Sequence, residues 1–185
     1  QVTKSSSWLF NCNLQQGLPW LGGKIVLASL FTHDDSKMLQ DGDLVNSKYN
    51  MLNASGSLLL SPYKDMTISY SLKYAYTDMK ACYSERTSFD RWQHEMSVVV
   101  PLSAFRFRLD GDYYHNQITD SKYKDMFLAN CTLGFKTRHI DWELKTSNIF
   151  NKKVYAYTTI SNLVTMQSVT AIRGREVMLS INYKP

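Results

Sequence analysis

Apolar and polar residues alternate along most of this chain, and the alternating segments are separated by breaks that are short and long in turn. The short breaks fall at residues 18–22, 61–65, 101–103 and 137–139. The long breaks fall at residues 32–48, 77–90, 116–124 and 161–171. Alternation with a period of two is typical of β-strands. A sheet with tight turns at one end and long loops at the other is typical of a transmembrane β-barrel.

Nine strands are predicted between these breaks. They cover residues 6–16, 23–31, 49–60, 66–76, 91–100, 105–115, 125–135, 140–156 and 173–184. Most have roughly the nine to eleven residues that a tilted strand needs to cross a bilayer. No helical pattern of comparable strength and no linker occurs. The sequence therefore predicts one all-β domain over residues 1–185, an antiparallel transmembrane barrel wall.

The strand at residues 105–115 shows the clearest alternation, and the start of the eighth strand repeats it. In both, charged residues occupy the positions between apolar ones. They give seven candidates for a charged surface facing the lumen: Arg106, Arg108, Asp110, Asp112, Asp141, Glu143 and Lys145. On adjacent strands these side chains would pair across the barrel wall, hold a plug in the lumen or contact a substrate. Structural pairing is the simplest of the three roles.

A soluble, lipocalin-like barrel would show the same alternation with its apolar face turned inward. The mean hydropathy of −0.32 does not decide between the two, because a barrel strand exposes only every second residue to lipid. Three features favour the membrane barrel. The polar positions are rich in Ser, Thr and Asn, the apolar faces begin or end with Tyr, Trp or Phe, and the breaks differ in length between the two ends.

Composition and motifs exclude several other classes. The net charge is +5, but the sequence contains no Lys/Arg-rich run, so a nucleic-acid partner is not predicted. The three cysteines show no metal-binding or redox spacing: Cys12 and Cys131 occupy apolar strand positions, and Cys82 falls in a predicted loop. No catalytic residue, metal ligand or cofactor is predicted. A barrel enzyme that uses His94 with Glu95, or His115 near Asp112, is the least favoured interpretation.

Two segments near the C-terminus have a recognisable pattern. One ends in Asn148-Ile149-Phe150-Asn151-Lys152-Lys153, and the other covers residues 173–184. They resemble the N-L-F-(N/D)-K-K-Y segment and the closing strand of TonB-dependent outer-membrane receptors, in particular the SusC-like type of Bacteroidota. The chain departs from the family where Ile149 replaces Leu, and where Lys184 and Pro185 follow the aromatic Tyr183.

The resemblance implies a barrel of roughly 22 strands, of which this chain would form the closing part. It also implies import of a bulky nutrient, such as a glycan, a peptide or a metal chelate, across the bacterial outer membrane. The implied partners are outer-membrane lipid, the remaining strands with a plug domain that is not in this chain, and TonB, which acts through the plug. A surface lipoprotein lid is a further partner that the resemblance allows.

The last strand has a separate implied role. By resemblance, the barrel assembly machinery recognises a C-terminal strand with alternating apolar residues and an aromatic residue near its end. The residues that match are Val177, Leu179, Ile181 and Tyr183.

Counting strands leads to a further expectation. Bacterial barrels have an even number of strands, and an unpaired strand edge cannot face lipid. Nine strands therefore require either that another segment supplies the remaining wall or that the true count is even. A small stand-alone barrel and a soluble ligand-binding barrel remain the alternative interpretations.

Overall fold

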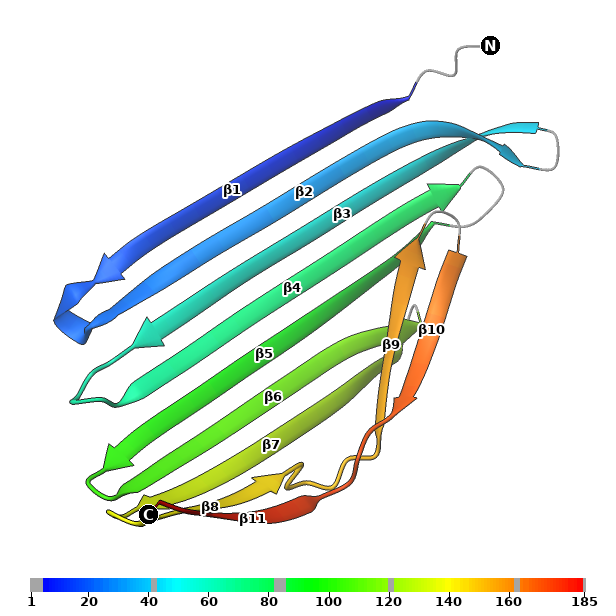
Figure 1. The fold of residues 1–185 in the computed structure, drawn as a ribbon. Coiled ribbons are helices and arrows are strands. Elements are labelled where there is room, and N and C mark those ends of the chain that lie inside the picture. Colours follow the sequence, from blue (N-terminus) through cyan, green and yellow to red (C-terminus); the bar gives the residue numbers. More distant parts are fainter. Residues whose placement is uncertain (1–4, 41–42, 82–85, 120–121, 162–163, 185) are drawn as a thin grey trace.

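The computed structural model is an antiparallel sheet that is open at both edges (Figure 1). It describes residues 5–40, 43–81, 86–119, 122–161 and 164–184. The elements are β1 (Ser6–Leu18), the 3-10 helix η1 (Pro19–Leu21), β2 (Gly23–Gln40), β3 (Asp43–Leu60), β4 (Thr67–Ala81), β5 (Thr87–Leu102), β6 (Phe105–Thr119), β7 (Lys122–Lys136), β8 (Ile140–Ser147), β9 (Val154–Ser161), β10 (Val164–Ala171) and β11 (Glu176–Tyr183).

Nine of these strands form one sheet in the order β1-β2-β3-β4-β5-β6-β7-β8-β11, and β9 and β10 form a separate hairpin. All neighbours in the sheet are antiparallel. The prediction of an all-β protein with an antiparallel sheet of nine strands is therefore confirmed, although the described residues contain eleven strands in all. The sheet does not close into a barrel, because β1 and β11 lie at opposite edges.

The four tight turns lie together at one end of the sheet, at the lower left in Figure 1. The first contains η1 and ends at Gly22, which has a positive φ of 58°. A Cβ at Gly22 would lie 2.7 Å from the carbonyl oxygen of Ser61 in the next turn, so only glycine fits there. Asp65 and Ser103 also adopt positive φ in their turns. The predicted placement of the short breaks is confirmed.

The predicted long loops are mostly strand, and this part of the prediction is wrong. β2 runs to Gln40 and β3 starts at Asp43, so residues 32–48 continue the hairpin almost to its tip. The breaks at residues 77–90 and 116–124 are likewise occupied largely by the ends of β4 to β7. Polar residues occupy both faces of these strand ends, so the period-two signal disappears although the backbone pairing continues.

The eighth predicted strand is also wrong, because β8 stops at Ser147. Asn148 and Asn151 adopt positive φ values of 50° and 53°, a conformation that asparagine tolerates better than most residues and that ends the strand. The rest of the predicted strand belongs partly to β9, and the predicted loop at residues 161–171 contains β10. The final strand, β11, starts at Glu176 rather than at residue 173.

The strand registers assemble one continuous apolar face. Residues directly opposite one another in an antiparallel pair share a face. One row across five neighbouring strands consists of Val100, Phe107, Leu133, Leu144 and Leu179. We call this side of the sheet the apolar face and the opposite side, which carries the intervening residues, the polar face.

Burial is unequal between the two faces. On the apolar face, Leu133 is 43% exposed and Leu144 is 42% exposed, although both belong to strands with a neighbour on each side. On the polar face, Met79 and Phe89 are buried and pack with Tyr49 near the β9–β10 hairpin. The hairpin contacts β5, β6 and β7. Within the described ranges, no helix has the length and apolar character to span a membrane.

Candidate functional site

The seven charged residues singled out in the sequence all lie on the polar face. Five of them, Arg106, Arg108, Asp110, Glu143 and Lys145, line one hollow of about 370 Å³. Gly134 lies between Arg106 and Glu143 in the same row and leaves the hollow open there. Asp112 lies farther along β6, and Asp141 lies at the end of β8 near the tight turns.

Pairing within this charged group is partial. The Nε atom of Arg108 lies 3.0 and 2.8 Å from the two carboxylate oxygens of Asp110, two residues along the same strand. Lys184 Nζ lies 2.5 Å from an oxygen of Asp141 and joins the end of β11 to β8. Within the described part of the chain, the side chains of Arg106 and Glu143 have no ion-pair partner.

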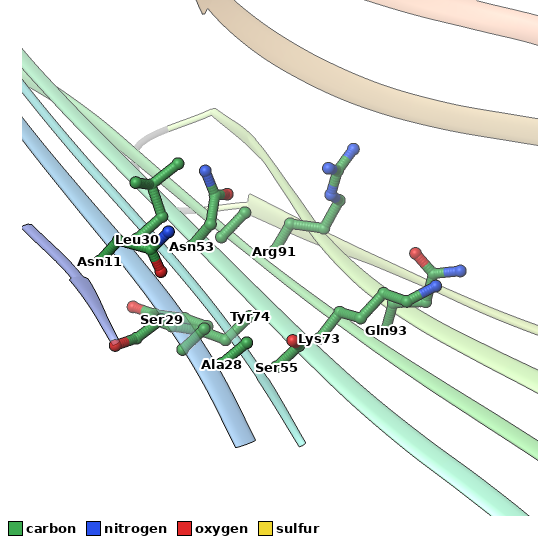
Figure 2. Close-up of a pocket in the computed structure, with 12 residues that line it drawn as sticks. Asn11, Ala28, Ser29, Leu30, Asn53, Ser55, Lys73, Tyr74, Arg91 and Gln93 are labelled. Atoms are coloured by element: carbon green, nitrogen blue, oxygen red, sulfur yellow. The ribbon is translucent and has the colours of Figure 1, made fainter. Parts of the chain in front are cut away.

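A second hollow on the polar face was not anticipated from the sequence (Figure 2). Its volume is about 300 Å³, and it lies across β1 to β5. The registers place Asn11, Leu30, Asn53, Ala75 and Arg91 in one row across these five strands. Small residues such as Ala28 and Ala75 form the floor of the hollow, and longer polar side chains such as Asn53 and Arg91 project from it.

The row beside this one carries a hydrogen-bonded group. It contains Ser55, Lys73 and Gln93 on β3, β4 and β5. Lys73 Nζ lies 2.8 Å from Glu95 Oε1, and Gln93 Nε2 donates a 2.7 Å hydrogen bond to the same oxygen. Both side chains are therefore held toward Glu95.

The β9–β10 hairpin covers the part of the polar face farthest from the tight turns. Asn116 Nδ2 donates to the Ala156 carbonyl at 3.0 Å, and Thr158 Oγ1 donates to the Ile118 carbonyl at 3.0 Å. The rings of Tyr114 and Tyr155 meet edge to face, 5.2 Å apart. The hairpin is thus attached to β6 by hydrogen bonds and by an aromatic contact.

The base of the hairpin is organised by Asn148. Its backbone N–H donates to Asn130 Oδ1 at 2.9 Å, and its side-chain Nδ2 donates to the carbonyls of Lys152 at 2.6 Å and Arg173 at 2.7 Å. Its Oδ1 accepts from the Lys152 backbone N–H at 2.9 Å. Asn148 therefore ties the two ends of the excursion between β8 and β11 together. The sequence pattern of residues 148–153 did not predict this role.

A polar network crosses the end of the sheet beyond the aromatic residues of the apolar face. Asn50 links His33 to Asp78. Its Oδ1 lies 2.6 Å from His33 Nδ1, and its Nδ2 donates a 3.0 Å hydrogen bond to Asp78 Oδ2. Arg86 donates to both oxygens of Asp78, at 2.7 and 3.0 Å. The pKa of Asp78 is lowered despite its burial. The hydrogen bonds from Arg86 contribute most, followed by the hydrogen bond from Asn50 and by the positive charge of Arg86.

The two residue pairs named for a barrel enzyme are not brought together, although His115 does contact another carboxylate, that of Asp125, at 2.5 Å. His94 lies on the apolar face and contacts Tyr70 at 2.7 Å, whereas Glu95 points to the polar face. His115 and Asp112 also lie on opposite faces. Among the residues that the structure places, no group of three His, Cys, Asp or Glu side chains could hold a metal ion.

The remaining singled-out residues lie at the apolar face or outside the described residues. Val177, Leu179, Ile181 and Tyr183 all point to the apolar face from the edge strand β11. Cys12 and Cys131 are free thiols on the same face. Cys82 lies outside the described residues.

No protein-family model, no curated protein and no solved structure matches this chain.

Proposed function

We propose that the protein forms part of the wall of a transmembrane β-barrel in a bacterial outer membrane, with its apolar face toward lipid and its polar face toward a lumen. The observation that carries this proposal is the continuous apolar face, which crosses all nine strands and remains exposed. Soluble proteins rarely expose apolar patches larger than a few hundred Å². Lipid is a solvent in which such a surface is stable.

Aromatic residues at two levels of the apolar face support the same proposal. Near the tight turns, Phe105, Phe135 and Trp142 lie in one row, and the two phenylalanine rings are 4.6 Å apart. At the other level, Tyr74 and Trp92 lie 4.3 Å apart. About ten residues of β5 separate the levels, or about 33 Å along the strand. A tilt of about 40° reduces this to about 25 Å, the height of the apolar band in outer-membrane barrels.

The hairpin argues against a soluble ligand-binding barrel, which is the alternative function. In a soluble barrel the apolar face is turned inward and filled by side chains. Here the excursion between β8 and β11 folds onto the polar face instead. That arrangement is expected when the polar face is the inside of the barrel.

Within this architecture, we propose that the chain forms the closing strands of a TonB-dependent receptor of the SusC-like type, which imports a bulky nutrient. The resemblance of residues 148–153 and 173–184 supports this assignment. So do the open edges at β1 and β11, because unpaired backbone must be covered by further strands before it can enter lipid. The remaining strands, a plug and TonB are the partners that this proposal requires, with a surface lipoprotein as a further partner.

Lipid contact tests the membrane assignment directly. Trp8, Trp92 and Trp142 lie on the apolar face, so brominated phospholipids should quench the tryptophan fluorescence of the reconstituted full-length protein. A protein that is monodisperse without detergent, with tryptophans insensitive to brominated lipid, would contradict the proposal.

The orientation has its own test. A single cysteine at Lys37, in a background without the native cysteines, should be labelled on intact cells by a membrane-impermeant reagent. A cysteine at Lys64, in a tight turn, should be labelled only after the outer membrane is permeabilised. Labelling of both from outside would refute the orientation.

A further inference from the structure

The hollow around Arg91 continues beneath the β9–β10 hairpin. A neighbouring hollow of about 210 Å³ is lined by Thr158 and Thr159 of the hairpin. The two hollows share Asn53, Ala75 and Arg91. They therefore form one groove, which is open over β1 to β4 and covered by the hairpin near β5. Arg91 stands where the open and covered parts meet.

The guanidinium of Arg91 has no carboxylate partner among the described residues. Glu95, on the same face of β5, is occupied by Lys73 and Gln93. Asp90 points to the apolar face, where its Oδ2 accepts from Trp92 Nε1 at 3.3 Å. A half-buried guanidinium with free donors is suited to bidentate binding of a carboxylate.

The groups around Arg91 are those that recognise hydroxyls. Asn11 and Asn53 lie in the same row, and each amide offers both donors and an acceptor. Ser55 lines the open part of the groove, and Thr158 and Thr159 line the covered part. Larger apolar side chains, among them Leu30, Met51 and Phe89, also line the groove and offer surface for the apolar faces of a sugar ring.

We propose that this groove binds a carboxylate-bearing saccharide, with the carboxylate on Arg91 and sugar hydroxyls on Asn11, Asn53 and the hairpin threonines. The inference rests on the proposed function, because it requires the polar face to line the path of the solute. It adds the substrate class, an acidic sugar of the uronic-acid type, and a position at which the hairpin closes one side of the binding site.

The test uses the full-length receptor in detergent and two matched probes, trigalacturonate and the neutral galactotriose. Isothermal titration calorimetry should show trigalacturonate binding at least about tenfold more tightly, as expected for one additional charge-assisted, bidentate contact. Arg91→Gln should lower the affinity for trigalacturonate by about tenfold and leave that for galactotriose unchanged. Arg91→Lys should give an intermediate loss, because lysine keeps the charge without the planar fork.

Arg138→Gln, in a tight turn far from the groove, is the matched control and should bind both sugars as the wild type does. Heat-modified migration on a denaturing gel checks that each variant is folded. An unchanged trigalacturonate affinity in folded Arg91→Gln, or equal affinities of the wild type for both sugars, would overturn the inference. Tighter binding of galactose 6-phosphate than of galacturonate would overturn the carboxylate assignment.

Failure of this inference can be distinguished from failure of the proposed function. A receptor that needs detergent and is quenched by brominated lipid, yet does not discriminate between the two sugars, would refute only the acidic-sugar site. A chain that is monodisperse in buffer would refute the membrane proposal whatever it binds.

Discussion

The two faces of this sheet differ in what covers them. The apolar face carries a continuous set of aliphatic and aromatic side chains and has no described segment packed across it, apart from a local contact between Phe150 and Phe127. The polar face carries the charges, and yet it is the one on which the β9–β10 hairpin folds and near which Met79 and Phe89 are buried. In a water-soluble protein the apolar side would receive the covering layer. This reversal is what the proposed location of the apolar face in lipid requires.

A charge introduced at adjacent positions on the two faces should have very different effects. Val98 lies on the apolar face midway between the aromatic levels, and Ser97 lies opposite Asp110 on the polar face. Val98→Arg should destabilise the protein in lipid vesicles by about 2–4 kcal/mol, because the charge enters the bilayer core. Ser97→Arg should have a much smaller effect, since the new guanidinium can pair with the carboxylate of Asp110. Urea unfolding of both variants in vesicles measures the difference, and equal losses would contradict the assignment of the faces.

The attachment of the hairpin to the polar face depends next on Asn148. Asn148→Ala should destabilise the base of the hairpin by about 2–3 kcal/mol, because the carbonyls of Lys152 and Arg173 lose their donor. Hydrogen exchange in β9 and β10 should increase while that of β3 and β4 stays unchanged. Asn46→Ala, at an exposed position of β3, serves as the control. A hairpin that remains equally protected would show that other contacts hold it.

The polar network beyond the aromatic level should respond to pH. The pKa of Asp78 is lowered in the folded protein, so its interaction with Arg86 stabilises the fold above the unfolded-state value of about 3.9 and is lost as the pH falls through the lower folded value. Asp78→Asn should cost about 1–2 kcal/mol at pH 7. The difference from wild type should shrink below about pH 4 in urea unfolding. Asp65→Asn, in an exposed turn, should leave that pH dependence unchanged.

The smallest expected effect concerns the contact of the hairpin with β6. Thr158→Val keeps the shape of the side chain but removes the hydroxyl that donates to the Ile118 carbonyl. The expected loss is about 1 kcal/mol, seen as faster proteolysis within β9 and β10. Thr165→Val, on the exposed strand β10, should leave the cleavage rate unchanged. Equal acceleration by both variants would mean that the Ile118 contact contributes nothing specific.

Some features could be predicted because they depend on local pattern. In residues 105–115, apolar and charged positions alternate strictly, and the structure places Leu109 and Asp110 on opposite faces as predicted. The ends of β2 and β3 could not be predicted in this way. Thr32, His33 and Asp34 are polar on both faces, so nothing in their order distinguishes a strand from a loop.

The break at Asn148 was missed for a different reason. The residues on both sides of it favour strands, whereas the contacts that stabilise the turn include the hydrogen bonds of Asn148 to Asn130, Lys152 and Arg173. Two of these partners are 18 and 25 residues away in sequence. A pattern read over a short window contains no information on such contacts.

Local sequence patterns were enough to predict which residues share a face within each strand, how many strands the sheet contains and where its tight turns lie. These features follow from the period of two and from local turn chemistry. Only the tertiary structure decided that Asn11, Asn53 and Arg91 stand in one row and that the hairpin closes over its end. Those neighbours come from separate strands. Their alignment depends on inter-strand register and on the path of a long excursion, both of which are non-local.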